Sequence, residues 1–160
     1  MEFLAALEAE MEHATLILRD RDAQDDYSDW DPGLGWVKVG QTIAFVVIHG
    51  VDGPVRCEIW RHGALRRLPV KIFSEQIETA SGWLLLEDPN GFYRIEVPTE
   101  FGPHNISLFA DDAQFASHVQ VIIDYLSDSE GSDLCNELPD NSFVWECRMR
   151  EIDSGDSQET

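Results

Sequence analysis

Positive charge is scarce in this sequence. Its 160 residues contain 11 lysines and arginines against 31 aspartates and glutamates, so the formal net charge at pH 7 is −20. Nucleic acids and anionic membrane surfaces are polyanions, and they repel a chain of this charge. The shortage of bases therefore excludes nucleic acid and membrane as natural partners. It favours a cationic protein, a cationic peptide or metal ions.

Long apolar runs, a secretory signal and paired cysteines are also missing. No segment approaches the roughly 18 apolar residues of a membrane-spanning helix. The opening residues, MEFLAALEAEMEH, contain neither the basic region nor the uninterrupted apolar region of a secretory signal. Cys57, Cys135 and Cys147 form no CxxC pair and leave one odd thiol. Together these absences predict a protein of the reducing cytoplasm.

Motifs for catalysis and cofactor binding are lacking too. The histidines show none of the HxxxH, HxH or HExxH spacings of metal sites, and the sequence has no P-loop, dinucleotide-binding fingerprint or nucleophile elbow. Cys57 lies among apolar neighbours, which is typical of a small buried residue rather than a reactive thiol. We therefore predict a protein that is not an enzyme, with no catalytic residues, no bound metal and no cofactor.

The negative charge is concentrated at the two ends of the chain. Residues 1–31 carry a net charge of −8 and residues 124–160 a net charge of −9, whereas residues 32–123 carry only −3. Five bases gather within residues 56–71, where they either pair with the acidic ends or line a face of a sheet. A nearly balanced body with two acidic flanks is suited to attract a cationic macromolecule.

The middle of the chain is a series of short runs rich in β-branched and aromatic residues, separated by turn sequences. Such runs at intervals of roughly 10–15 residues, without a long helical pattern between them, predict an all-β fold, an antiparallel β-sandwich. Asn90 and Gly91 within EDPNGF indicate a hairpin. The alternation of apolar and charged residues from Tyr93 to Val97 indicates a half-buried strand.

The two ends of the chain differ from this pattern. Phe3, Leu7 and Met11 have helical spacing, which allows a short N-terminal helix. Towards the other end, SDSEGSD has the composition of an acidic linker. We therefore divide the chain into a β-sandwich domain at residues 1–126 and an acidic C-terminal extension at residues 127–160.

Residues 20–33, DRDAQDDYSDWDPG, form an acidic segment that contains six aspartates together with Tyr27 and Trp30. Three interpretations are open. A calcium loop of the EF-hand type would need glycine at the sixth position, where Asp25 stands, and a helix after it. A plain solvated loop would serve solubility alone. A recognition surface would use Tyr and Trp as anchors among carboxylates that steer a basic partner.

We favour the recognition surface, because aromatic residues are unusual in a purely solubilising acidic loop. The predicted partner-binding residues are the carboxylates and aromatic rings at the centre of the acidic segment. They are Asp22, Asp25, Asp26, Tyr27, Asp29, Trp30 and Asp31. For Trp30, burial over the edge of the sandwich is the alternative.

Short motifs mark the starts and ends of the predicted strands across residues 14–126. They are Asp29-Trp30, Gly35-Trp36, Pro69-Val70, Gly82-Trp83, Val97-Pro98 and Gly102. The order of these motifs resembles that of the competence protein J family. Members of that family are small acidic inhibitors of β-sandwich type that act on a nuclease of their own cell. The resemblance therefore implies an inhibitor of a nuclease or another basic effector, as a related toxin-immunity protein would be.

Charge and resemblance lead to the same prediction. The protein is expected to be a cytoplasmic immunity or inhibitor protein that occludes the active-site groove of a basic effector, with a nuclease toxin as the expected partner. Two other classes stay open: a non-enzymatic accessory or chaperone-like module that docks through the acidic extension, and a metal-dependent enzyme. Deletion of residues 127–160 separates the first alternative from the inhibitor.

Overall fold

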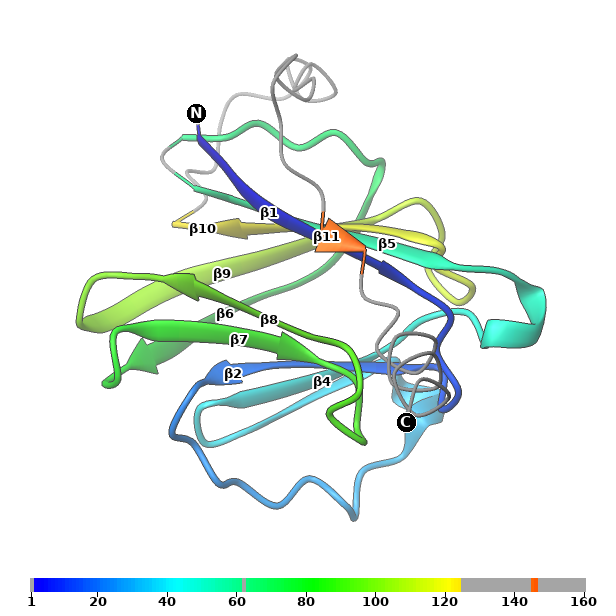
Figure 1. Cartoon of the computed structure of the whole chain (residues 1–160), viewed down its shortest axis with the longest axis horizontal. Coiled ribbons are helices and arrows are strands. Elements are labelled where there is room, and N and C mark those ends of the chain that lie inside the picture. The colour runs from blue at the N-terminus through cyan, green and yellow to red at the C-terminus, as the bar shows by residue number, and fades with distance from the viewer. Residues whose placement is uncertain (1, 62, 125–144, 147–160) are drawn as a thin grey trace, which may run out of the picture.

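The computed structural model describes residues 2–61, 63–124 and 145–146 of the chain, and these form two β-sheets packed face to face (Figure 1). One sheet has the strand order β11-β1-β5-β10-β9-β6, and the other has the order β3-β4-β2-β7-β8. Within the described residues, the helical elements are the 3-10 turns η1 (Pro32–Leu34) and η2 (Gly50–Asp52). The predicted all-β sandwich is confirmed. No helix of the described part is long and apolar enough to cross a membrane.

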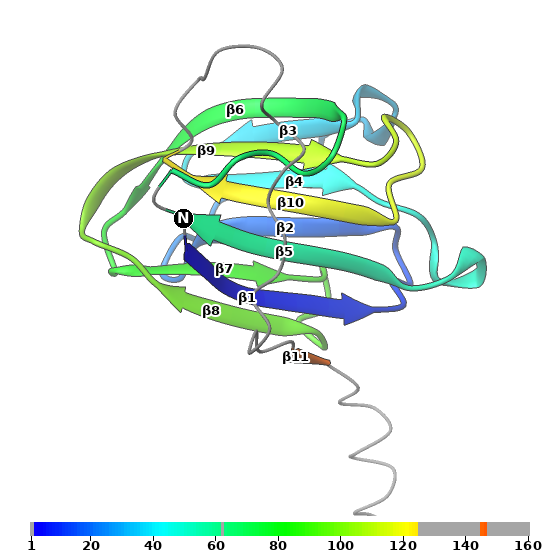
Figure 2. The ribbon, with the colours of Figure 1, turned by 90° about the horizontal axis from the view of Figure 1, so that it is seen from above.

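The strands of each sheet pair mainly in antiparallel fashion (Figure 2). The exceptions are the parallel pairs β5–β10 and β1–β11. The six-stranded sheet consists of β1 (Glu2–Ala9), β5 (Val55–Arg61), β6 (Val70–Thr79), β9 (Gly102–Ala110), β10 (His118–Ile123) and β11 (Trp145–Glu146). The five-stranded sheet consists of β2 (Thr15–Asp20), β3 (Trp36–Val39), β4 (Thr42–Val46), β7 (Trp83–Glu87) and β8 (Arg94–Pro98).

The main core lies between the two sheets and is filled by the side chains that face inward from both. Phe73 of β6 links the layers, since its ring centroid lies 5.0 Å from that of Trp36 and 6.2 Å from that of Phe45. Cys57 of β5 is also fully buried there, and its burial raises the pKa of the thiol. The expectation that this cysteine is a small buried residue is confirmed.

A second, smaller apolar cluster covers the outer face of the six-stranded sheet. Trp60 and Phe109 project outward from β5 and β9, and Ala64 and Leu68 from the connection at residues 63–69 pack against them. The connection between β5 and β6 therefore lies across the sheet instead of standing away from it.

Strand β8 and the turn before it confirm two local predictions. Ile95 and Val97 are buried while Arg94 and Glu96 are exposed, as the alternation of a half-buried strand requires. The turn that joins β7 to β8 contains Gly91 with a φ of +70°, a conformation that favours glycine.

The predicted N-terminal helix is wrong, because residues 2–9 form β1 and pair with β5. Leu7 faces the core together with Ala5 and Ala9, which is the two-residue period of a strand. A register shift between Phe3 and Ala5 turns Phe3 to the outer face, where its ring lies 5.3 Å from that of Trp60. Pairing with a neighbouring strand thus overrides a local spacing that also fits a helix.

The acidic extension falls outside the described residues except for Trp145 and Glu146. These two residues form β11, beside Leu7 and Glu8 of β1. The division of the chain at residue 126 stays a prediction.

Replacing Phe45 with alanine should destabilise the fold strongly, because the side chain is 1% exposed and fills space between the sheets. The free energy of unfolding should fall by about 3–5 kcal/mol. Phe115→Ala is the matched control: Phe115 is 68% exposed, and its loss should change that free energy by less than about 0.5 kcal/mol. Urea unfolding followed by tryptophan fluorescence measures both, and equal effects would contradict this description of the core.

Candidate functional site

The acidic segment lies in the connection between β2 and β3, which passes over the outer face of the five-stranded sheet (Figure 1). Arg19 of β2 holds its beginning, because Nη1 donates to the carbonyl oxygens of Arg21 at 2.6 Å and of Ala23 at 3.0 Å. Nη2 of the same side chain pairs with Glu87 of β7 at 3.1 Å. The half-buried Arg19 therefore ties the start of the acidic segment to β2 and β7.

Two aspartates of the segment turn inward and bind the chain itself. Asp20 is buried, and its Oδ1 accepts hydrogen bonds from Oγ of Ser81 at 2.6 Å and from the backbone N–H of Ser81 at 3.0 Å. Asp25 is half-buried, and its Oδ2 accepts from the N–H of Gln41 at 2.9 Å and from Oγ1 of Thr42 at 3.0 Å. The predicted partner-binding residue Asp25 thus holds the loop against the turn between β3 and β4.

Four other predicted aspartates are exposed on this loop. Asp22 pairs with the arginine before it at 3.6 Å, and Asp29 has no ion pair among the described residues. Hydrogen bonds from the side chain and backbone of Ser28 lower the pKa of Asp26. Asp31 accepts a hydrogen bond from the N–H two residues later and caps η1. The structure therefore places four carboxylates on one surface loop, open to solvent.

Tyr27 and Trp30 are half-buried. Burial raises the pKa of the Tyr27 hydroxyl, and the nearby negative charge of Glu87 raises it further, which places Tyr27 near β7. Ile17 and Leu85 face the same side of the sheet as the loop and are buried, although neither belongs to the main core. The two aromatic side chains therefore leave only part of their surface open to a partner.

A calcium loop requires carboxylates that converge on one point, and here they diverge. Asp20 faces Ser81, Asp25 faces the turn between β3 and β4, and Asp31 caps η1. Within residues 2–61 and 63–124, no group of three or more histidine, cysteine, aspartate or glutamate side chains is placed to hold a metal ion.

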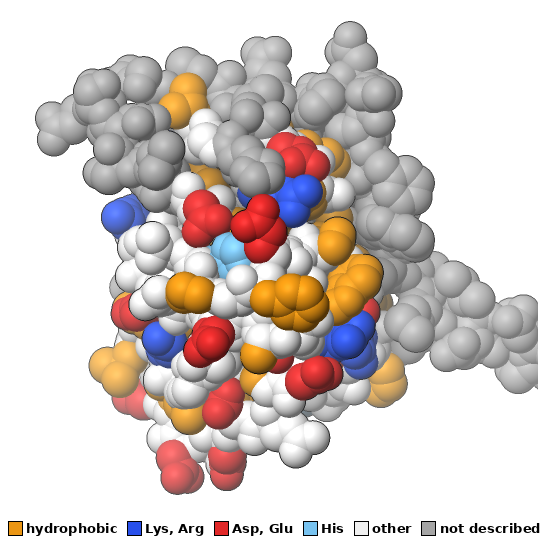
Figure 3. All heavy atoms as spheres, turned by 90° about the vertical axis from the view of Figure 1, so that its left-hand side faces the viewer, with side chains coloured by type: hydrophobic (Ala, Val, Ile, Leu, Met, Phe, Trp, Pro, Cys, Tyr) orange, Lys and Arg blue, Asp and Glu red, His pale blue; other side chains and the backbone are white. Residues whose placement is uncertain are grey.

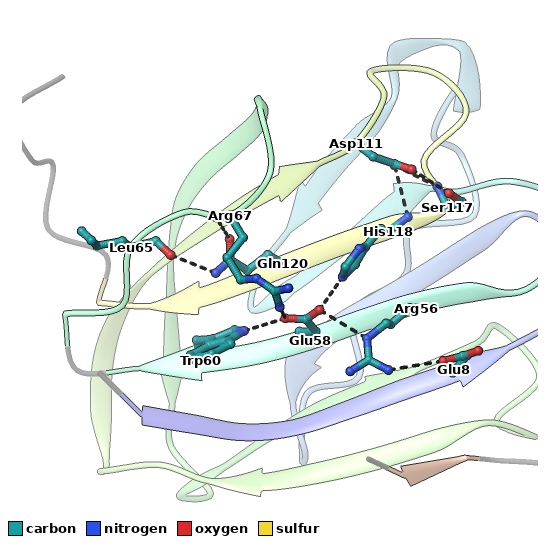
Figure 4. A network of polar contacts seen from close by, with 10 residues as sticks. All are labelled: Glu8, Arg56, Glu58, Trp60, Leu65, Arg67, Asp111, Ser117, His118 and Gln120. Carbon is teal, nitrogen blue, oxygen red and sulfur yellow. Dashed lines mark hydrogen bonds and ion pairs between the residues drawn. The ribbon is translucent and has the colours of Figure 1, made fainter. Parts of the chain in front are cut away.

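Glu58 of β5, which no sequence pattern singled out, lies at the centre of a polar network on the outer face of the six-stranded sheet (Figure 4). Its fully buried carboxylate accepts hydrogen bonds from Nε1 of Trp60 at 2.9 Å and from Nη1 of Arg67 at 2.5 Å. Nε of Arg56 lies 3.3 Å away, and Nε2 of His118 is a further partner.

Burial raises the pKa of Glu58, but hydrogen bonds from His118 and Trp60, with the positive charges of His118 and Arg67, outweigh it. The result is a pKa lowered from an ordinary 4.5 to about 2. The side chain of Gln120 completes the network: it accepts from the N–H of Arg67 at 2.7 Å and donates to the carbonyl oxygen of Leu65 at 3.0 Å. The network therefore fastens the connection at residues 63–69 to the sheet.

Three of the five bases within residues 56–71, namely Arg56, Arg61 and Arg67, pair with acids. Arg56 pairs with Glu8 at 3.3 Å, and Arg61 pairs with Glu2 at 2.8 Å. The acidic N-terminal flank is thus divided. The glutamates at positions 2 and 8 are neutralised by β5, whereas the exposed aspartates of the loop are not held by these arginines in the part of the chain that is described.

The most enzyme-like side-chain pair of the described residues is His104 with Asp124, beside a hollow of about 30 Å³. Nδ1 of the histidine lies 3.1 Å from Oδ2 of Asp124, and Nε2 lies 2.7 Å from the carbonyl oxygen of Glu100. Both ring nitrogens of His104 therefore lie within hydrogen-bond distance of oxygen atoms of the protein itself. The pair closes one end of the sandwich.

Solved structures show which fold this is. The crystal structure of ComJ from Bacillus subtilis, an inhibitor of the DNA degrading activity of NucA, matches 76% of this chain and 96% of its own chain, with a TM-score of 0.59. The chain has the ComJ fold. The two sequences are 9% identical, so the similarity concerns the fold. No family model and no curated protein matches the sequence. ComJ itself is an inhibitor rather than an enzyme.

Replacing Glu58 with glutamine should lower the free energy of unfolding by about 3–5 kcal/mol, because Arg56 and Arg67 lose their shared partner. Glu96→Gln is the control, since its pair with Arg94 is exposed and should contribute at most about 1 kcal/mol. Denaturant unfolding at neutral pH compares the two variants. A small effect at both positions would show that the network contributes little to stability.

The stabilisation by Glu58 should also depend on pH. Its pKa is lowered in the folded state, so the stabilisation is present above pH 4.5 and is lost as pH falls towards 2. The stability of Glu58→Gln should accordingly fall less steeply than that of the unaltered protein over this window. Parallel curves would contradict the lowered pKa.

Asp25→Ala should loosen the acidic loop without unfolding the sandwich, because the N–H of Gln41 loses its acceptor. Hydrogen exchange at this amide should accelerate about tenfold, as expected for the loss of one hydrogen bond of about 1.4 kcal/mol. Asp26→Ala removes an exposed neighbouring carboxylate and serves as the control. Unchanged exchange at Gln41 in the Asp25 variant would show that this carboxylate does not hold the loop.

Proposed function

We propose that the protein is a cytoplasmic immunity or inhibitor protein that binds a positively charged effector, a nuclease toxin above all, and covers its active-site groove. The observation that carries the proposal is the ComJ fold, because ComJ inhibits DNA degradation by NucA. The net charge of −20 gives the second support, since it selects a cationic partner. The protein acts by binding alone and needs neither a cofactor nor catalysis of its own.

The acidic loop supplies the chemistry for this role. A nuclease groove is built to receive the phosphates of nucleic acid, so it presents positive charge. Asp22, Asp26, Asp29 and Asp31 offer carboxylates to such a groove and raise the rate of encounter. Tyr27 and Trp30 supply the apolar contact that slows dissociation, since Tyr and Trp are common binding hot spots. Asp25 holds the loop in place for both.

Inhibition of DNA degradation tests the function directly. DNases are first captured on the immobilised protein from an extract of the cell that produces it. The purified protein is then added to NucA and to each captured DNase, and the cleavage of plasmid DNA is measured. We expect one of these nucleases to be silenced at a molar ratio near one. A variant that ends at residue 126 should inhibit equally well if the acidic loop is responsible. Inhibition lost with the extension would assign the role to residues 127–160, and nucleases that bind but remain active would overturn the proposal.

The four exposed aspartates should act on the association rate with the inhibited nuclease. Changing Asp22, Asp26, Asp29 and Asp31 to asparagine should slow association about tenfold or more at about 50 mM salt and very little at about 500 mM, because salt screens exposed charges. The matched control changes four other acids to glutamine, Glu75, Glu78, Glu96 and Glu100, with the same change of net charge. Equal slowing in both variants would assign the effect to net charge and not to the loop.

A further inference from the structure

Five loops meet at one end of the sandwich, on the right in Figures 1 and 2. They are residues 10–14, 31–35, 47–54, 88–93 and 111–117. Backbone hydrogen bonds join three of them. The N–H of Gly50 donates to the carbonyl oxygen of Met11 at 2.8 Å, and the N–H of Ile48 donates to that of Ala116 at 2.9 Å.

The other two loops border this group. The carbonyl oxygen of Gly35 accepts from the N–H of Val46 at 2.9 Å, next to the loop at residues 47–54. The side-chain amide of Asn90 lies 2.9 Å from Nε2 of His13. The five loops therefore form one continuous surface, which we call the loop end.

The loop end exposes apolar side chains that the core does not use. Four of the five large exposed apolar side chains of the described residues lie on it, on four different loops. Leu34 is 74% exposed, Val51 is 83% exposed and Phe115 is 68% exposed; Phe92 is the fourth. Apolar residues gathered at one end of a domain, and rimmed by polar groups, are typical of a contact with another protein.

A hollow of about 300 Å³ lies between these loops. Its lining combines the carboxylates of Glu10 and Glu12 with His49, Val51 and Tyr93. An open space lined by carboxylates and apolar groups suits a long cationic side chain, whose methylene stem packs on apolar surface while its charge meets an acid.

The loop end is also uniformly negative. Its five loops contain seven acidic residues and no lysine or arginine. Hydrogen bonds from the N–H groups of Phe115 and Gln114 lower the pKa of Asp112, so this carboxylate is ionised at neutral pH. The opposite end differs, because acidic and basic side chains lie beside one another there (Figure 3), and Arg61 and Glu100 line the same small hollow.

We propose that the loop end is a second docking surface, and that it receives a cationic protein whose contact surface carries apolar side chains among its lysines and arginines. A second copy of this chain is a poor occupant, because its net charge of −20 is repelled by this end. The inference rests on the proposed function only for the sign of the partner's charge, and it holds whether or not that partner is a nuclease.

Two synthetic peptides test the surface with the full-length chain. One contains six lysines and two phenylalanines, and the other has glycines in place of the phenylalanines. Titration followed by amide chemical shifts should show the phenylalanine peptide binding at the loop end, about tenfold more tightly than the glycine peptide. The triple variant Leu34→Ser, Val51→Ser and Phe115→Ser should lose this preference, while Phe101→Ser, at the opposite end and 78% exposed, should keep it.

Each other result counts against the proposal. Equal affinity for the two peptides, or no saturable binding, would show that the exposed apolar side chains recognise nothing cationic. Chemical-shift changes confined to residues 22–29, or to the surroundings of Phe101, would show that the peptide binds outside the loop end. Self-association that the triple variant abolishes would make a second copy the occupant. Nuclease inhibition is measured in a separate assay. If the protein inhibits no nuclease, the peptide titrations can still be interpreted.

Discussion

Mutual repulsion of negative charge is the constraint that the rest of this structure has to meet. With 31 acidic residues against 11 bases, the chain cannot neutralise its own surface. The described arginines are largely used inside the fold. Arg19 lies under the acidic loop, Arg56 and Arg67 surround Glu58, and Arg61 holds the first strand. These four arginines are only partly exposed and are paired with acids, so most of the charge left at the surface is negative. The proposed cationic partner would relieve the repulsion within it.

The two surfaces proposed for binding are continuous with each other. The acidic loop crosses the outer face of the five-stranded sheet and ends at Asp31, which caps η1. Leu34 at the end of η1 already belongs to the loop end. A partner that engages both would meet separate carboxylates along one loop and apolar side chains at its far end. Charge then governs the encounter and apolar contact governs the residence time, a division that is common in protein complexes.

Much of the architecture could be predicted because strands and turns leave local traces in a sequence. Alternation in β8 and a glycine with positive φ in the preceding turn are examples. Residues 2–9 allow a helix as well as a strand, because the spacing of Leu7 fits both periods, and only pairing with β5 decides between them. Glu58 left no trace, since an acid in a strand usually faces solvent; its four partners come from strands β5 and β10 and from the connection at residues 63–69.

By itself, the sequence determined the fold class, the concentration of acid at the ends of the chain and the position of the acidic segment between two strands. These depend on composition and short-range pattern. Only the tertiary structure decided which aspartates face solvent. Asp25 turns inward because Gly40, with a φ of +56°, leaves room where a Cβ would lie 2.2 Å from its Oδ1. It likewise decided that five loops meet at one end, because strand order brings together residues that lie far apart along the chain.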